Sequence, residues 1–284
     1  MKFSYYPGCS LHSTAQEYEM SIHAVCDALG VGLDELPDWS CCGASSAHCT
    51  DFNLSLSLPA RNLAIAETRG LDVAVGCAAC FLRFKTAAYE LRRDERLKQE
   101  IVDAVGMPYQ GRYRTRHLLD IICNDIGENA IREKVRRPLA DLKVVSYYGC
   151  LLVRPPKVTE FGNPENPVLM DGLMEWLGAA PRDWAGKVDC CGGSLALTRT
   201  DIVCKLVEDL MTYARRAGAT CIVTACPLCQ ANLDTRQESA EQAAMPIFYF
   251  TELLGLAMGL PDTDKWFKKH IISPSELLKS LGLL

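Results

Sequence analysis

A duplicated pattern of cysteines constrains this chain more than any other feature. Two adjacent cysteines followed by glycine occur in the segment DWSCCGAS and again in KVDCCGGS. In both cases 36 positions separate the first cysteine of the pair from the first cysteine of a later CxxC motif. One more cysteine precedes each pair, in the segments SYYPGC and SYYGC. The two matched sets are Cys9, Cys41, Cys42, Cys77 and Cys80, and Cys150, Cys190, Cys191, Cys226 and Cys229. A repeated spacing indicates a repeated structural unit.

The length of the chain agrees with two such units. Its 284 residues fit two domains of ordinary size, and an apolar fraction of 49% is enough for two cores. We therefore predict a first domain over residues 1–142 and a second over residues 143–284. The second includes a tail from Pro261 onward that has no counterpart in the first, and we expect it to be a packed terminal helix.

Composition and charge exclude several classes of function. The formal net charge of −5 and the lack of basic blocks give no reason to expect binding to nucleic acid or an anionic membrane. No signal peptide and no apolar run long enough to span a membrane are apparent, so the chain is expected to be cytoplasmic. Because cytoplasmic thiols are kept reduced, the 15 cysteines indicate metal or redox chemistry better than structural disulfides.

The hydrophobic pattern predicts an α/β fold in each half. Short apolar runs read as buried strands at residues 2–6, 71–76, 143–148, 221–225 and 246–250. Helical spacing predicts helices over residues 13–29, 54–69, 80–105, 128–141, 168–177 and 200–217. Alternation of this kind favours two parallel sheets, which collect ligands at the carboxyl ends of their strands. Four of the ten cysteines follow predicted strands, so each set should converge. If the halves pack about a pseudo-twofold axis, the two sites can face each other. We predict that they lie face to face across one cavity at the interface of the halves.

The cysteines and histidines outside the two sets are expected to have ordinary roles. Cys26, Cys123, Cys204 and Cys221 are predicted to be small core residues. His48 and Cys49 have no counterpart in the second half and are expected to be loop residues. His117 is expected to be a surface or capping residue.

Five cysteines at each site narrow the choice of cofactor. A structural zinc takes four ligands and would leave one cysteine spare in both halves. Disulfides are disfavoured by the expected compartment. Iron–sulfur clusters are held by thiolates, and a fifth cysteine indicates an unusual cluster.

The pattern C…CCG…CxxC resembles the cysteine-rich CCG domain. Over residues 3–259 the chain, which consists of little more than two copies of this pattern, resembles the B subunit of heterodisulfide reductase. The segments that carry the resemblance are YYGC, DCCGG, CPLCQANLD and LLGLAMG. The resemblance implies one non-cubane [4Fe-4S] cluster in each half, held by the five cysteines of that half. It also implies reductive cleavage of the disulfide between coenzyme M and coenzyme B, which lies between the clusters, each of which captures one sulfur.

The partners are inferred from what the sequence lacks. It contains no C-x₂-C-x₂-C-x₃-C-P run and no GxGxxG element. By resemblance, electrons should arrive through a ferredoxin-like iron–sulfur subunit that is supplied by a flavin-containing subunit. Two alternatives stay open: an electron-relay subunit without catalysis of its own, and a zinc-stabilised scaffold.

The substrate is not fixed by the sequence. Small-molecule or protein disulfides other than the one named above fit the pattern equally well. Four basic residues close to the cysteines are candidates for binding an anionic thiol, and each of them is as readily explained as a solvated surface charge. They are Arg83, Lys85, Arg154 and Lys157.

Overall fold

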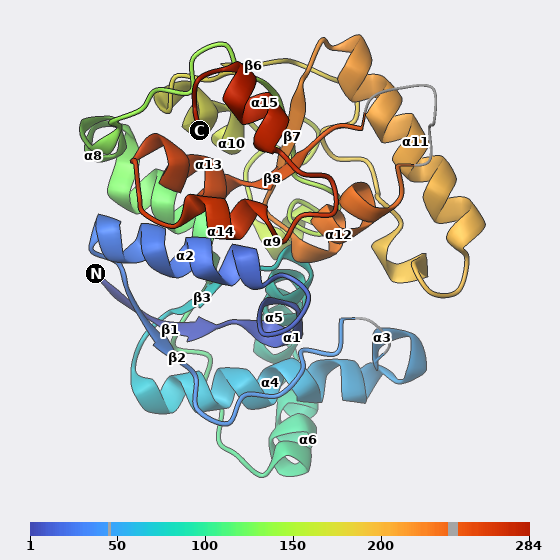
Figure 1. Cartoon of the computed structure of the whole chain (residues 1–284). Coiled ribbons are helices and arrows are strands. Elements are labelled where there is room, and N and C mark those ends of the chain that lie inside the picture. The colour runs from blue at the N-terminus through green and yellow to red at the C-terminus, as the bar shows by residue number, and fades with distance from the viewer. Residues whose placement is uncertain (45–46, 238–243) are drawn as a thin grey trace.

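Two four-stranded parallel sheets form the framework of the protein. The computed structural model describes residues 1–44, 47–237 and 244–284, and every strand pair in them is parallel (Figure 1). The strand orders are β2-β1-β3-β4 and β6-β5-β7-β8. The strands are β1 Lys2–Tyr6, β2 Gly32–Glu35, β3 Val73–Val75, β4 Thr115–His117, β5 Lys143–Tyr147, β6 Ala180–Pro181, β7 Cys221–Thr224 and β8 Ile247–Tyr249. The predicted α/β class is therefore confirmed.

The central strands of each sheet are buried on both faces. In β1 and β5 only the first residue is exposed, and β3 and β7 are buried throughout. Such strands read as continuous apolar runs, which is why the sequence predicted them. The edge strands β2, β4 and β6 were missed, because they are short and carry charged residues or proline.

Helices connect the strands and cover the sheets. None of the helices in the described part of the chain is long and apolar enough to cross a lipid bilayer. They are α1 Gly8–Leu11, α2 Gln16–Leu29, α3 Ala47–Thr50, α4 Phe52–Arg69, α5 Ala78–Arg93, α6 Glu95–Val105, α7 Leu118–Asp120, η1 Ile121–Ile126, α8 Gly127–Lys134, α9 Pro156–Thr159, α10 Leu169–Trp176, η2 Gly193–Leu195, α11 Thr200–Arg216, α12 Pro227–Thr235, α13 Phe250–Ala257, α14 Thr263–Phe267 and α15 Ser275–Ser280.

Two of the predicted helices were wrong in extent. The single helix expected over residues 80–105 is two helices, because the Asp94 carboxylate accepts a hydrogen bond from Leu97 N and caps α6. The helix expected over residues 128–141 ends at Lys134. Beyond it the backbone bonds to the second half of the chain instead, for example from Arg136 N to Ala257 O at 2.9 Å.

The two halves contact each other reciprocally. Helix α2 of the first half packs on α13 and α14, and α10 of the second half packs on α7 and α8. Figure 1 shows α2 lying alongside α14. In the same way α5 contacts α9 and α12 contacts α1. At the first junction Tyr18 stacks on Tyr249 with ring centroids 4.0 Å apart, and the hydroxyl oxygens of Ser21 and Thr251 are 2.6 Å apart. This reciprocity is what a pseudo-twofold arrangement produces.

The C-terminal tail is docked on the second half and on α2. It forms two short helices, α14 and α15, rather than the single helix expected. Trp266, Phe267 and Leu278 are buried. The Asp234 carboxylate accepts hydrogen bonds from the backbone N–H groups of Ile271 and Ile272, at 2.8 and 3.1 Å. The tail is therefore held by apolar contacts and by its own backbone.

Candidate functional site

Four of the ten cysteines, Cys9, Cys77, Cys150 and Cys226, follow the carboxyl ends of central strands, as the sequence predicted. Cys77 directly precedes α5 as its N-cap residue, and Cys226 occupies the same place before α12. Cys80 and Cys229 lie in the first turns of these helices. The N–H groups and the positive dipole end of a helix stabilise negative charge at this position. Hydrogen bonds among the thiols decide where this charge lies: the pKa of Cys226 is lowered, whereas the pKa values of Cys77, Cys80 and Cys229 are raised.

A buried tyrosine lies at the centre of the first set. The Tyr6 hydroxyl donates a hydrogen bond to Ser40 O at 2.9 Å and so holds the loop that carries Cys41 and Cys42. Burial raises the pKa of Tyr6, and so do the neighbouring thiols. Those thiols belong to Cys80, Cys42, Cys41 and Cys9. Tyr6 had no predicted role, although it lies in the SYY segment that is repeated before Cys150.

The second set repeats this geometry. The Tyr147 hydroxyl donates to Asp189 O at 2.7 Å, directly before the cysteine pair. Its pKa is raised first by burial and then by the thiols of Cys229, Cys191, Cys150 and Cys190. Tyr6 and Tyr147 therefore play the same local role, each fixing one CCG loop around four thiols.

Short sulfur contacts link the cysteine pair to the CxxC motif in each half. The sulfur atoms of Cys42 and Cys80 are 3.2 Å apart, and those of Cys191 and Cys229 are 3.5 Å apart. The glycine after each pair donates its N–H to the first sulfur, from Gly43 to Cys41 at 3.4 Å and from Gly192 to Cys190 at 3.3 Å. Two segments distant in sequence thus meet at one place in both halves.

The two sets also meet each other. The thiols of Cys77 in the first half and Cys226 in the second shift each other's pKa, so the two lie close together. Both side chains are buried. In contrast, Cys9, Cys41 and Cys190 are exposed and Cys150 is half-buried. Each set therefore has an inner end at the junction of the halves and an outer end open to solvent.

At least one thiol in each set has a lowered pKa. Hydrogen bonds from Cys41 and Cys80 lower the pKa of Cys42 despite its burial. A hydrogen bond from Cys150 lowers the pKa of Cys190 to about 6. Hydrogen bonds from Cys229 and Cys77 lower the pKa of Cys226 well below its usual value. Thiolates are the form of cysteine that binds metals.

The donor set suits a cluster of several iron atoms. In residues 1–44, 47–237 and 244–284, no three Cys, His, Asp or Glu side chains converge closely enough to hold one metal ion. The thiols instead surround Tyr6 and Tyr147 at several points. A cluster is wider than a single ion and takes thiolate ligands at separate iron atoms, so these residues fit the group that the resemblance implies.

His117 was expected to be a surface or a capping residue, and the structure shows that it does not lie at the surface. It is fully buried, and its Nδ1 accepts a hydrogen bond from Leu119 N at 3.2 Å, so the capping role is correct. Its Nε2 lies 3.1 Å from both Gly76 O and Ala225 O. These are the residues directly before Cys77 and Cys226. Burial lowers the pKa of His117 to about 4, so the imidazole is neutral at physiological pH.

The remaining cysteines and His48 occupy varied positions. Cys26, Cys123 and Cys221 are buried as predicted, whereas Cys204 is only half-buried. His48 and Cys49 lie in the short helix α3 rather than in a loop, and Cys49 is exposed. The two serines before α3, at positions 45 and 46, lie outside the described residues.

Four basic residues were candidates for binding an anionic thiol. Among the described residues, Arg83 is the one of the four that lies near a thiol of the first set and forms no ion pair with an acidic side chain. Lys85 forms an ion pair with Glu160 at 2.6 Å, and Arg154 forms one with Glu165 at 2.9 Å. Lys157 is exposed. Burial lowers the pKa of Arg83, and the negative charges of Cys42 and Cys49 oppose this shift. The Arg83 guanidinium is therefore next to the first set.

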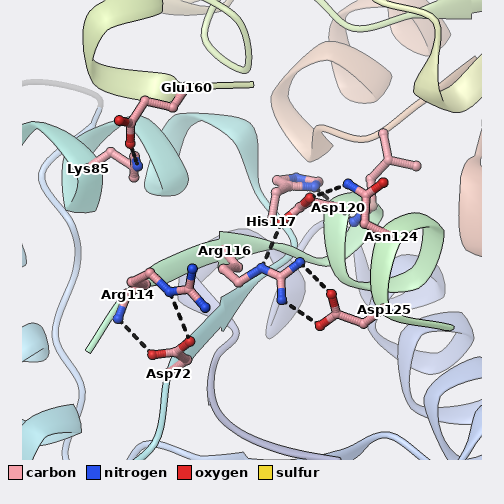
Figure 2. Close-up of polar contacts among 10 residues, drawn as sticks. Asp72, Lys85, Arg114, Arg116, His117, Asp120, Asn124, Asp125 and Glu160 are labelled. Carbon is pink, nitrogen blue, oxygen red and sulfur yellow. Dashed lines mark hydrogen bonds and ion pairs between the residues drawn. The ribbon is translucent and has the colours of Figure 1, made fainter. Parts of the chain in front are cut away.

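A cavity of about 450 Å³ lies between the two halves. Its wall includes Phe81 and His117 from the first half and Phe161 from the second. Figure 2 shows the Lys85–Glu160 ion pair on one side of His117 and the Arg116 guanidinium bound to Asp120 and Asp125 on the other. None of the ten cysteines, all of which the structure describes, lines the cavity. It is therefore separate from the two thiol sets and is not the cavity that was predicted between them.

Alanine at Gly149 is expected to lower the iron content of the second site. Gly149 has φ +65°, and an added Cβ would lie 3.1 Å from the sulfur of Cys229. The backbone strain alone costs about 1 kcal/mol. The tight contact is expected to shift the sulfur of Cys229, one of the candidate ligands. Gly218→Ala is the matched control, because Gly218 has φ +73° with open space around it. Iron and sulfide assays of both variants test the prediction, and equal losses in the two would contradict it.

Comparisons with known proteins agree with this geometry. The family model described as "Cysteine-rich domain" (CCG) matches residues 3–85 and 144–234. The chain is 35% identical over 282 residues to the "8-methylmenaquinol:fumarate reductase membrane anchor subunit" of Wolinella succinogenes, covering 97% of this chain and 99% of that protein. It is 29% identical over 291 residues to the B subunit of the ferredoxin/F(420)H(2)-dependent CoB-CoM heterodisulfide reductase of Methanosarcina acetivorans, covering 99% and 97%.

A solved structure supports the fold alone. A hypothetical protein from Helicobacter pylori superposes with a TM-score of 0.73 at 10% identity, over 96% of this chain and 52% of that one. The chain thus spans about half the length of that protein. The two matched segments each hold one complete five-cysteine set, and the relatives include several heterodisulfide reductase B subunits at 26–29% identity. The chain therefore belongs to the cysteine-rich CCG-domain family, with two copies of the domain and the organisation of the heterodisulfide reductase B subunit.

Proposed function

We propose that the chain is the catalytic iron–sulfur subunit of a heterodisulfide reductase-like complex. The observation that carries the proposal is the proximity of Cys77 and Cys226. They directly follow Gly76 and Ala225, whose carbonyl oxygens both lie 3.1 Å from His117 Nε2. This proximity brings two complete five-thiol sets together at the junction of the halves. Disulfide cleavage takes two electrons, RSSR + 2 e⁻ + 2 H⁺ → 2 RSH. Two adjacent redox sites can supply one electron each to the two sulfurs. We take the boundary between the domains to lie near residues 142 and 143.

Two clusters, proposed to be of the non-cubane [4Fe-4S] type, would be held by the two cysteine sets. The first set is Cys9, Cys41, Cys42, Cys77 and Cys80, and the second is Cys150, Cys190, Cys191, Cys226 and Cys229. When bound, the clusters supply one-electron transfer and iron sites with affinity for sulfur. The protein supplies orientation and electrostatics.

The residues of the chain contribute to the reaction by positioning. Tyr6 and Tyr147 hold the two CCG loops in place through hydrogen bonds to Ser40 O and Asp189 O. Cys77 and Cys226, at the inner ends of the sets, are shielded from bulk solvent by burial. Arg83 is suited to an anionic group on the substrate, because it lies beside Cys42 without an ion pair in the described residues. Fixed geometry of this kind lowers the entropic barrier of a two-site reaction.

The proposal requires a source of electrons. We infer that a ferredoxin-like iron–sulfur subunit delivers them from a flavin-containing subunit, and that the complex works in the cytoplasm. The relative from Methanosarcina acetivorans carries a name that couples ferredoxin to disulfide reduction. This supports the direction of electron flow that we propose for the chain.

Two measurements test the proposal on anaerobically purified protein. Iron and acid-labile sulfide should both be present, in amounts that correspond to two clusters. Reduced viologen should be oxidised when the disulfide of coenzyme M and coenzyme B, or another low-molecular-weight disulfide, is added. Zinc in place of iron, or a full complement of clusters without any disulfide-dependent oxidation, would contradict the proposal.

A second candidate is an electron-relay subunit. It is favoured by the 35% identity to a subunit of an 8-methylmenaquinol:fumarate reductase over nearly the whole chain. In that case the two clusters carry electrons between a quinol and another subunit, and no disulfide is cleaved. Oxidation of the pre-reduced clusters by a menaquinone analogue, but not by disulfides, would support the relay over the disulfide reductase.

A further inference from the structure

We propose that His117 is a positioning residue that fixes the two cysteine sets relative to each other. The inference rests on the proposed function, since it requires a redox site in each half. A single imidazole N–H is shared between Gly76 O and Ala225 O, each 3.1 Å from Nε2. Gly76 precedes Cys77 and Ala225 precedes Cys226, so the shared hydrogen bond ties together the two strand ends from which the inner ligands project.

The hydrogen bonds assign the tautomer of His117. Its Nδ1 lies 3.2 Å from Leu119 N, and a backbone N–H can only donate, so Nδ1 carries no proton. A neutral imidazole then carries its proton on Nε2, where both acceptors lie. A proton on Nδ1 would point at the Leu119 N–H group, and two hydrogen-bond donors that face each other repel. The ring therefore has one stable state in which it donates to both halves.

Aromatic contacts from both halves hold the imidazole plane. Phe81 of α5 packs edge-on with ring centroids 5.9 Å apart, and Phe161 of the second half does so at 6.2 Å. His117 itself is fully buried. Because the ring is fully buried, a change in the spacing of Gly76 and Ala225 would break one of the two hydrogen bonds and leave a buried acceptor without its donor, which is costly.

Among the described residues of the second half, the side chain at the position equivalent to His117 makes no hydrogen bond that joins the two halves. Tyr249 ends β8 as His117 ends β4, but its hydroxyl lies 3.4 Å from Gln230 Oε1, within its own half. The Tyr18 hydroxyl donates to Gly76 O at 2.9 Å, and both residues belong to the first half. The Tyr18 ring stacks on Tyr249 of the second half, but its hydroxyl hydrogen bond stays within the first half. Tyr18→Phe keeps the stacked ring and removes only that hydrogen bond to the acceptor shared with His117, which makes it a matched control.

Three variants of the full chain with its clusters test the inference. His117→Phe keeps a ring and removes the donor, His117→Gln keeps an N–H donor at similar reach, and Tyr18→Phe removes a buried hydrogen bond to the same carbonyl. Iron content, the magnetic interaction between the clusters in electron paramagnetic resonance, and the kcat of disulfide cleavage are measured. His117→Phe should retain iron, alter the interaction and lower kcat roughly 100-fold, as a small misplacement of reacting groups does. His117→Gln and Tyr18→Phe should resemble the wild type in all three.

The other outcomes overturn the inference. The inference is wrong if the magnetic interaction between the clusters is unchanged in His117→Phe. It is also wrong if Tyr18→Phe alters this interaction as His117→Phe does, or if His117→Gln does not retain the wild-type interaction. If His117→Phe does not fold, His117→Asn replaces it, since its shorter amide cannot reach both carbonyls. Should neither fold, His117 is a folding residue and the inference is wrong. A wild-type chain without two iron–sulfur clusters would instead refute the proposed function.

Discussion

Replacing Cys226 and Cys229 together by alanine is expected to abolish disulfide cleavage while one cluster stays reducible. The two residues are the inner pair of the second set, and Cys226 lies close to Cys77 of the first. The variant should lose about half of the iron and sulfide, because the first set keeps its five thiolates. The remaining cluster can deliver only one electron, which is insufficient to cleave a disulfide. Iron analysis, redox titration and the viologen assay measure the three expectations.

A buried cysteine outside the two sets is the control for this experiment. Cys26 is 1% exposed in α2, and Cys26→Ala should cost about 1–2 kcal/mol of packing with no loss of iron. Substantial disulfide reduction by the Cys226→Ala/Cys229→Ala variant, after one whole cluster is lost, would rule out a two-site mechanism. Loss of a cluster in Cys26→Ala would show that the ligand set is wrong.

Replacing His270 by alanine is expected to destabilise the protein by about 3–5 kcal/mol near neutral pH. His270 Nε2 lies 2.9 Å from Glu252 Oε1, and neither side chain is exposed. The other carboxylate oxygen of Glu252 accepts a hydrogen bond from Tyr249 N at 2.9 Å. Without the imidazolium, a buried carboxylate at the base of α13 loses its charge partner, and the C-terminal tail loses an anchor.

The effect should depend on pH in a defined direction. Burial alone lowers the pKa of His270, but the Glu252 carboxylate outweighs it and raises the pKa to about 9. The pKa of His270 is higher in the folded state than in the unfolded state, where it is about 6.5. The contribution of His270 to stability is therefore complete below about pH 6.5 and is lost as the pH rises through the folded-state pKa. Glu17, Asp234 and Lys269 also lie near the pair, and the Glu17 pKa is raised by burial to about 7.

Denaturant unfolding of the wild type and His270→Ala at several pH values measures this dependence. The difference in free energy of unfolding should be largest near pH 6 and should shrink toward about pH 10. His12→Ala is the control, because His12 forms a 3.6 Å pair with Glu35 and is 43% exposed, so it should contribute at most about 1 kcal/mol. A difference that grows with pH would contradict the assignment of a buried ion pair.

The sequence by itself determined the repeat, the two cysteine sets and the α/β class. These rest on properties that are local in the chain. The 36-residue step, the apolar runs of β1, β3, β5 and β7, and the CxxC motifs at helix starts can each be read within a short window. Strand-end cysteines could then be placed at one edge of each sheet, because parallel strands share that edge.

Only the tertiary structure decided how these parts are held together. Tyr6 and Ser40 are 34 residues apart, and His117 and Ala225 are 108 apart, so no local pattern predicts their hydrogen bonds. The edge strands β2, β4 and β6 carry too little apolar character to be recognised before a partner strand is in place. Burial gives His117 its place between the halves, and burial depends on the packing of the whole chain. For this reason the sequence identified the candidate ligands, whereas the fold revealed the residues that position them.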